Sequence, residues 1–129
     1  MRLPSRGKDG DGGYVTPAFV ATTGFTMLLL VVVANLLVLR YADGILQTAV
    51  EEGVRQGVAT GDPTSCTARA ASVVAHGLGP MASAVAPATC SVAPDGAAAE
   101  VHATFAGWLP IVPDHVTSAV AHTAALAVD

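Results

Sequence analysis

The sequence predicts an α+β protein with one long N-terminal helix, a short second helix and a small antiparallel sheet of about three strands. Three observations lead to this fold class. Residues 14–39 form an uncharged run of 26 residues, and helical periodicity continues from there to about residue 60. Farther along, apolar and polar residues alternate on either side of Pro94-Asp95-Gly96, a sequence typical of a hairpin turn.

Composition limits what kind of core and partner the chain can have. The 129 residues allow one small domain. Hydrophobic residues make up 52% of the chain but aromatic residues only 5%, so a core built mainly from alanine and valine would be thin. Beyond Leu39 three arginines face eight carboxylates, which excludes the basic stripe that nucleic-acid binding needs.

Residues 14–40 are predicted to form a transmembrane helix. Thr16 and Pro17 match an N-cap followed by proline at the first helical position. From Pro17 to Leu39 the helix would measure roughly 34 Å, enough for a hydrocarbon core of about 30 Å. Arg40 and Tyr41 then stand where a cation and an interfacial aromatic are expected.

Two alternatives to a retained anchor are a buried helix of a soluble protein and a cleaved secretory signal. A chain of this length could hardly surround so apolar a helix. A signal has an apolar region of about 7–15 residues and a small-x-small cleavage site, whereas residues 38–42 read Val-Leu-Arg-Tyr-Ala. We therefore expect a single-pass protein of a bacterial cytoplasmic membrane. Residues 1–13, with three cations, would be a flexible cytoplasmic leader, and the C-terminal part would be extracytoplasmic.

Residues 41–60 are predicted to continue the helix amphipathically and to end before Gly61-Asp62-Pro63. A helix kink at Gly44 is compatible with the sequence. Small residues recur every four positions along one face, where the chain's own following sheet or another helix could pack closely. They are Ala49, Gly53 and Gly57.

Polar side chains within the apolar run could mediate helix packing in the membrane. Thr22 and Thr26 can bond to their own helix, but Asn35 is costly in lipid without a partner. The alternatives for Asn35 are contact with another helix and tolerance as an isolated polar residue.

Residues 61–129 are predicted to form the exported α+β domain. A helix over residues 66–82, a hairpin around Pro94-Asp95-Gly96 and a third strand within residues 116–128 would build it. The residues expected on one side of that helix are Ala68, Ala71, Val74, Ala75 and Leu78.

Cys66 and Cys90 are expected to form a disulfide, because both follow the membrane helix and an oxidising compartment would link them. The bond would close a loop of about 25 residues, worth on the order of 3.5 kcal/mol in the chain-entropy model. Two unlinked thiols are the alternative. Neither a C-x-x-C motif nor a histidine partner motif supports a redox or zinc role.

The arrangement resembles the TadE-like (TadE/TadG-like) pseudopilins of tight-adherence, or Flp-type, pili. The similarity covers residues 12–128 and rests on residues 36–58, "LLVLRYADGILQTAVEEGVRQGV", and on the strands around "WLPIVP". It implies a pilin-like fold and a minor pilin-like subunit or assembly factor of a Tad pilus or secretion apparatus. Its partners would be other membrane-embedded pilin-like or Tad assembly proteins, together with the lipid bilayer.

Gly13 is the candidate site for leader cleavage that the resemblance implies. Processed members of the family carry glutamate at the fifth position after the cut, where this chain has Ala18 after Gly13 and Pro17 after Gly12. A related envelope protein that is not processed is the alternative.

The sequence offers no catalytic constellation, so we expect no enzyme, cofactor, metal or small-molecule substrate. The motifs G-x-S-x-G, a phosphate loop and paired carboxylates are absent from it. The histidines are expected to be solvated, with His102 and His122 as potential cross-strand neighbours. Trp108 could contact a partner or cover its own core. A membrane-tethered binding module that acts alone is the second functional hypothesis, and an anchored hydrolase lacks support.

Overall fold

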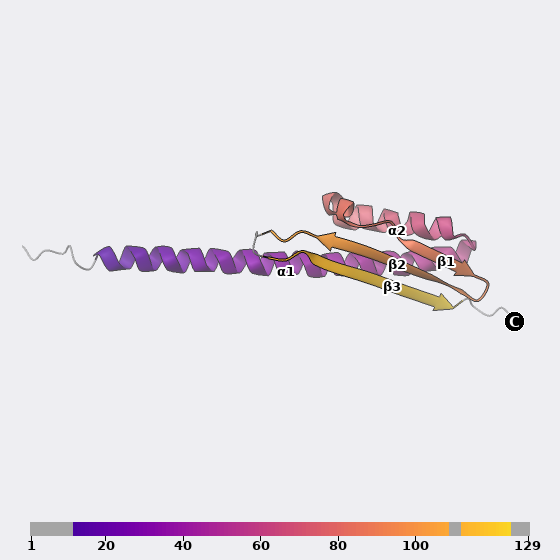
Figure 1. Ribbon diagram of the computed structural model, residues 1–129, viewed down its shortest axis with the longest axis horizontal. Helices are drawn as coiled ribbons and strands as arrows, with labels where there is room; N and C mark the ends of the chain where they lie inside the picture. Colours follow the sequence, from indigo (N-terminus) through magenta and orange to yellow (C-terminus); the bar gives the residue numbers. More distant parts are fainter. Residues whose placement is uncertain (1–11, 109–111, 125–129) are drawn as a thin grey trace, which may run out of the picture. The chain divides into compact units, whose positions relative to one another are not determined.

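The computed structural model describes residues 12–108 and 112–124, with side chains from residue 16 onward. The chain divides into two compact units, Met1–Leu36 and Leu37–Asp129, called unit 1 and unit 2 below. The elements are α1 (Gly12–Thr60), α2 (Pro63–Leu78), the 3-10 helix η1 (Gly79–Ala84), β1 (Thr89–Ala93), β2 (Gly96–Phe105) and β3 (His115–Ala124). This order confirms the predicted fold class (Figure 1).

Helix α1 begins earlier than its sequence signal suggests. The first helical residue is Gly12, and Pro17 lies inside the helix, so the predicted start at Thr16-Pro17 is wrong. A Thr-Pro pair favours a helix start, but it cannot prevent another turn from forming upstream, because proline disturbs only the bonds of the turn before it. The predicted end is correct, since the last helical residue is Thr60.

Unit 2 packs its part of α1 and helix α2 with a three-stranded antiparallel sheet in the order β1-β2-β3 (Figure 1). Strands β1 and β2 join through a two-residue turn, with Ala93 opposite Gly96. Strand β3 pairs with β2 along its whole length, from Phe105 opposite His115 to Gly96 opposite Ala124. The predicted hairpin and third strand are thus confirmed.

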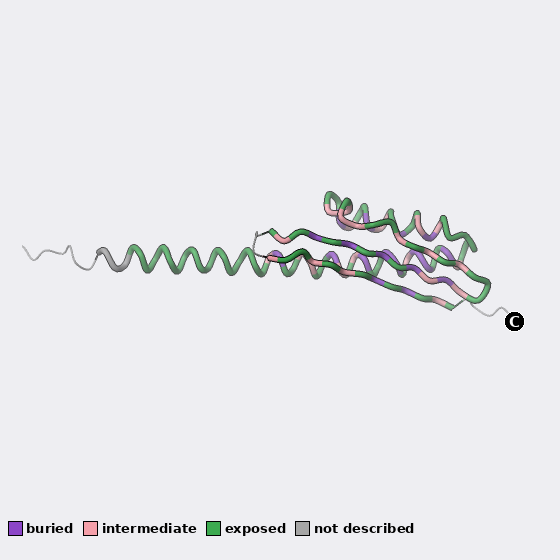
Figure 2. The backbone as a smooth tube through the Cα atoms, in the orientation of Figure 1, coloured by how far each residue is buried: buried purple, intermediate pink, exposed green. Residues whose placement is uncertain are grey.

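The core of unit 2 consists mostly of small side chains. Leu46 and Val50 of α1 and Val101 of β2 are the largest aliphatic residues that are fully buried. Around them β2 and β3 contribute every second residue, as expected of a sheet with one buried face. Those residues are Ala97, Ala99, Ala103, Phe105, Ala119 and Ala121. Figure 2 shows this alternation along the strands.

Helix α2 buries a different stripe from the predicted one. Val74 and Leu78 are buried as expected, together with Cys66 and Ala70. The remaining predicted residues, Ala68, Ala71 and Ala75, are exposed. Alanine is small enough to occupy either face of a helix, so an alanine-rich sequence marks its buried side poorly, and here the disulfide at Cys66 belongs to the buried stripe.

Candidate functional site

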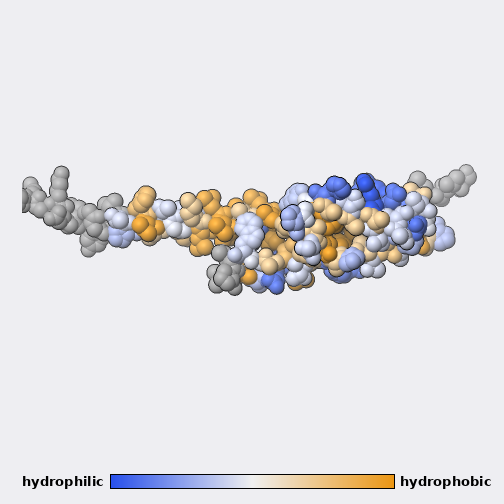
Figure 3. All heavy atoms as spheres, turned by 90° about the horizontal axis from the view of Figure 1, so that it is seen from above, coloured by the Kyte–Doolittle hydropathy of each residue, from blue (hydrophilic) through white to orange (hydrophobic). Residues whose placement is uncertain are grey.

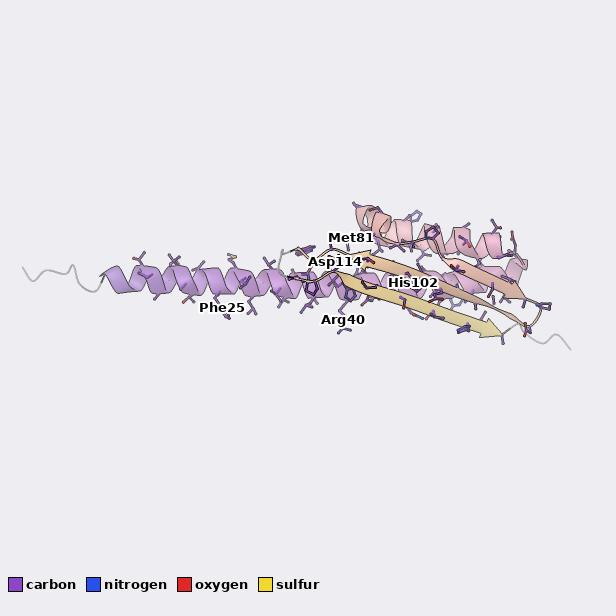
Figure 4. The ribbon with its side chains drawn as sticks, in the orientation of Figure 1. Phe25, Arg40, Met81, His102 and Asp114 are labelled. Atoms are coloured by element: carbon purple, nitrogen blue, oxygen red, sulfur yellow. A yellow bond between two sulfur atoms is a disulfide. The ribbon has the colours of Figure 1, made fainter. Side chains whose placement is uncertain are left out.

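The described part of unit 1 is a helix that exposes large apolar side chains in every direction. Phe19, Phe25 and Leu29 are 68%, 67% and 52% exposed. The seven consecutive residues Met27–Val33 are all exposed, and seven residues cover the whole circumference of a helix. Figure 3 shows these side chains as an orange stretch, and Figure 4 shows Phe25 pointing away from the helix.

An all-round apolar helix that is not buried by its own protein is typical of a membrane span. The helix is long and apolar enough to cross a bilayer, with a mean hydropathy of 2.2 in its most apolar window. One exposed apolar helix near the N-terminus is therefore consistent with a single membrane span. Its length also accommodates the predicted span over residues 14–40.

The polar residues of the apolar run differ in their hydrogen bonds and in their burial. The Thr22 hydroxyl donates to the Ala18 carbonyl, and the Thr26 hydroxyl donates to the Thr22 carbonyl, each at 2.8 Å. These bonds within one helix turn remove most of the cost of a hydroxyl in lipid. Asn35 is buried, with 7% of its surface exposed.

The small-residue face of α1 lies against α2 and β1 of the same chain. A Cβ atom added at Gly53 would stand 3.1 Å from the Cys66 carbonyl oxygen, and one at Gly57 would stand 3.1 Å from Val92 Cγ2. Ala49 on the same face is fully buried. Glycine and alanine here let the disulfide-bearing helix approach closely, so this face is occupied within unit 2.

The disulfide joins the first turns of α2 to β1. Cys66 and Cys90 are linked with a Cα–Cα distance of 6.2 Å, and Cys66 is fully buried. Helix α2 starts at Pro63, where the Asp62 carboxylate accepts a hydrogen bond of 2.9 Å from the Thr64 amide. Asp62-Pro63 thus follows the end of α1 and also forms the start of α2, with Asp62 as N-cap and proline at N1, a start signal that the sequence reading missed.

Two long-range hydrogen bonds fasten one end of unit 2, called the Asp43 end below. The Tyr41 hydroxyl donates to the Gly77 carbonyl of α2 at 2.9 Å. His115 Nε2 at the start of β3 lies 3.1 Å from Asp43 Oδ1. These contacts bring α1, the end of α2 and the start of β3 together, although Asp43 and His115 are 72 positions apart.

His76, His102 and His122 are exposed, as expected, whereas His115 is half-buried. His102 and His122 are not cross-strand neighbours, because their β-sheet partners are Ser118 and Ala98. His102 Nε2 instead lies 3.0 Å from Glu100 Oε1 on the exposed sheet face, where Figure 4 labels it. The His115–Asp43 pair depends on tertiary packing and leaves no local signal in the sequence.

Trp108 lies in the β2–β3 loop with 54% of its surface exposed. It therefore does not cover the core of unit 2 fully, and it remains a candidate contact residue. Just before it the loop narrows, because a Cβ atom added at Gly107 would stand 2.8 Å from the Val112 carbonyl oxygen. Residues 109–111, which belong to the predicted "WLPIVP" connection, lie outside the described residues.

An apolar groove of about 200 Å³ lies between α2, the segment after η1 and β2. Its lining includes Ala70, Val74, Val85, Pro87 and Val101. The chain after η1 pairs with β2 here, since Val85 bridges Ala103 and the Ala86 amide donates to the His102 carbonyl at 2.9 Å. The sequence reading missed this extra strand-like pairing, for which alanine-rich sequence gives little periodic signal.

The leader and its candidate cleavage site are described only in part. Residues 1–11 lie outside the described residues, and Gly13 is in the first turn of α1. Among the described residues, no group of three or more His, Cys, Asp or Glu side chains could hold a metal ion.

Comparison of the chain with protein-family models, with curated proteins and with solved structures finds no match. The architecture itself is pilin-like. It combines a long N-terminal apolar helix with a disulfide-bonded domain in which a three-stranded antiparallel sheet packs on the second part of that helix.

Proposed function

We propose that this protein is a TadE-like minor pilin subunit or assembly factor of a Tad/Flp-type bacterial pilus or related secretion apparatus. It acts through protein–protein contacts and not through catalysis. The resemblance of residues 36–58 to the membrane-exit segment of that family supports the proposal, and so does the pilin-like architecture. The observation that carries it is the exposure of large apolar side chains all around residues 19–33.

The exposed apolar surface gives the protein two ways to act in a bilayer. Lipid satisfies such a surface, and helices of other membrane proteins satisfy it equally well, because packing between apolar helices in lipid depends on fit more than on water exclusion. The helix would therefore hold the protein beside pilin-like or Tad assembly proteins. Unit 2 would then present its outer sheet face to neighbouring subunits or to the exported substrate.

Unit 2 is proposed to lie outside the cytoplasm, with the N-terminus inside. The three cations of residues 1–13 favour a cytoplasmic leader. The Cys66–Cys90 disulfide supports the same orientation, because such bonds persist in oxidising compartments.

The assembly proposal can be tested by photo-crosslinking in the bacterium that makes the protein. A photoreactive side chain at Leu29 should give crosslinks to other membrane proteins of the pilus apparatus. The matched position is Gln47, which is exposed on the part of α1 in unit 2 and should give different products. Deleting the protein should reduce piliation. If piliation is unchanged and Leu29 crosslinks only lipid, the protein is a lone tethered binding module.

Asn35 provides a second test of helix packing. Within the chain itself only 7% of Asn35 is exposed, so Asn35→Leu should weaken copurification with partner membrane proteins only if the amide turns to another helix in the membrane. Thr26→Val is the matched control, since the Thr26 hydroxyl is satisfied by the Thr22 carbonyl of its own helix. Equal recovery of partners with both variants removes Asn35 from the proposal.

Intact mass of the protein from its native membrane tests processing and oxidation together. Loss of the leader after Gly13 would shorten the chain by 13 residues. The disulfide lowers the mass by two hydrogens relative to the reduced chain. An uncut, oxidised chain would support the non-processed, TadE/TadG-like alternative within the same proposal.

A further inference from the structure

The Asp43 end of unit 2 is the end next to the uncharged run of α1. Leu39 is the last residue of that run, and Asp43 stands about 6 Å farther along the helix at 1.5 Å per residue. Arg40 is exposed at this level and points away from α1 in Figure 4. If residues 14–40 span a bilayer, this end of unit 2 lies at its surface.

The directions of β2 and β3 place the loop between them at the Asp43 end. Strand β3 starts beside Asp43, and its later residues 120–123 share a surface depression with Gln47 and Glu51 of α1. Strand β3 therefore runs alongside α1 in the same direction, and its antiparallel partner β2 runs back toward the uncharged run. After Phe105 the chain leaves the sheet at the Asp43 end.

Trp108 is within reach of the level of Leu39. It follows Phe105 by three residues, which span at most about 10 Å when extended. Phe105 is opposite His115, whose ring contacts Asp43. Gly107 lies close to Val112, so the two sides of the loop approach each other just before Trp108. The Trp108 side chain is half exposed.

The exposed large apolar residues of unit 2 are concentrated at this end. Among the described residues Leu37, Tyr41, Trp108 and Val116 are 65%, 56%, 54% and 73% exposed. Val120 is the remaining one, at 45%, and it lies farther along β3. Asp114 at the same end is exposed (Figure 4), and a headgroup region can solvate its carboxylate.

We infer that Trp108 inserts into the headgroup–acyl interface of the bilayer that holds α1 and so seats unit 2 directly on the membrane. The inference rests on the proposed membrane anchoring. Tryptophan and tyrosine favour this interface because the ring is apolar and one edge can donate a hydrogen bond. Tyr41 supplies a second exposed aromatic at the same end, on α1, and Arg40 supplies a cation for lipid phosphate. The contact gives unit 2 a second attachment, besides α1, to the bilayer.

The inference can be tested with Trp108 itself, because it is the only tryptophan of the chain. The full-length protein is reconstituted into vesicles of phosphatidylcholine and phosphatidylglycerol, some carrying bromine near the top of the acyl chains and some near their ends. Selective excitation of tryptophan should show quenching by the shallow bromines, weaker quenching by the deep ones, and a blue-shifted emission. Aqueous acrylamide should quench it poorly.

A matched variant moves the tryptophan away from the Asp43 end. In Trp108→Phe/Val120→Trp the indole stands at the exposed Val120 position, and its emission should be red-shifted, quenched by acrylamide and unaffected by either bromolipid. Flotation of the vesicles tests membrane anchoring separately from the insertion of Trp108. A chain that does not float overturns the anchoring and this inference together. A chain that floats while Trp108 stays open to acrylamide and insensitive to bromolipid overturns this inference alone.

Discussion

Helix α1 contains two stretches that share one backbone conformation and differ in what surrounds them. In residues 16–36 the large side chains point outward, as with Leu29 at 52% exposure, whereas in residues 37–60 Leu46 is fully buried. The first stretch exposes large apolar residues on every side. The second exposes Gln47, Glu51 and Arg55 on one face and buries the opposite face.

Side-chain size follows the same division and explains it. Where protein packs on α1, the helix uses small residues such as Ala49, Gly53 and Gly57, so that α2 and β1 can approach closely. In the first stretch leucine, valine and phenylalanine dominate, and such side chains need lipid or another protein around them. The choice of residues alone thus gives the two stretches of one helix different surfaces.

Charged residues placed in the first stretch should have the largest effect, because they oppose membrane insertion. In Leu29→Arg/Val32→Arg each arginine costs about 2.5–3.5 kcal/mol near the centre of a membrane helix, so the pair opposes insertion by roughly 5–7 kcal/mol. The fraction of protein that resists alkaline carbonate extraction should fall to background. Gln47→Arg/Thr48→Arg, at exposed positions of the second stretch, should leave this fraction unchanged. Equal extraction of both variants would contradict a membrane span.

Loss of the disulfide should affect only unit 2. Cys66→Ser/Cys90→Ser should lower its free energy of unfolding by about 3.5 kcal/mol, because the loop between the two residues is no longer closed in the unfolded chain. Thermal unfolding in detergent should show a melting temperature lower by roughly 15–25 °C, with carbonate resistance retained. Ser91→Ala on the exposed side of β1 is the control. An unchanged melting temperature would mean that the bond contributes nothing to folding.

Two glycines of α1 differ in how closely other residues pack against them. Gly53→Leu should destabilise unit 2 by about 1–3 kcal/mol, because the side chain would collide with Cys66 and Ala70. Gly44→Leu should instead stabilise the helix by up to about 1 kcal/mol, since nothing lies within 4 Å of an added Cβ there. Denaturant titration measures both. Similar effects at the two positions would show that helix propensity, and not close packing, governs this face.

The smallest effect is expected at the Asp43 end. Asp43→Asn removes the charge that faces His115, and since both side chains are about one-third exposed, the loss should be at most about 1 kcal/mol. The same titration detects it, with Asp95→Asn in the exposed hairpin turn as control. A loss of several kcal/mol would indicate that the pair is far better shielded from water than its exposure implies.

The features of the fold that could be predicted are those with a local cause. The uncharged run, the helix end at Gly61-Asp62-Pro63 and the hairpin at Pro94-Asp95-Gly96 each follow from consecutive residues. The pairing of Cys66 with Cys90 followed from there being only two cysteines, both on one side of the apolar run. Chain entropy and turn chemistry act at this range, so sequence reasoning reaches it.

What could not be predicted depends on contacts between distant segments. The Asp43–His115 contact, the pairing of Val85 with Ala103 and the buried stripe of α2 arise only when three elements meet. Alanine is frequent in these segments, and its weak preference for inside or outside hides the buried face. At the candidate site, the sequence indicated Trp108 as a contact residue, but only the strand directions place it near the end of the uncharged run.

The pairing of β3 with β2 has a consequence for how the protein matures. During synthesis the ribosome releases Leu46 and Val50 long before the strand that begins at His115. A chain interrupted ahead of His115 would leave one border of β2 without its ladder, and open ladders recruit other polypeptides. Fragments that end ahead of β3 should therefore tend to aggregate, and only chains that carry β3 should complete the sheet.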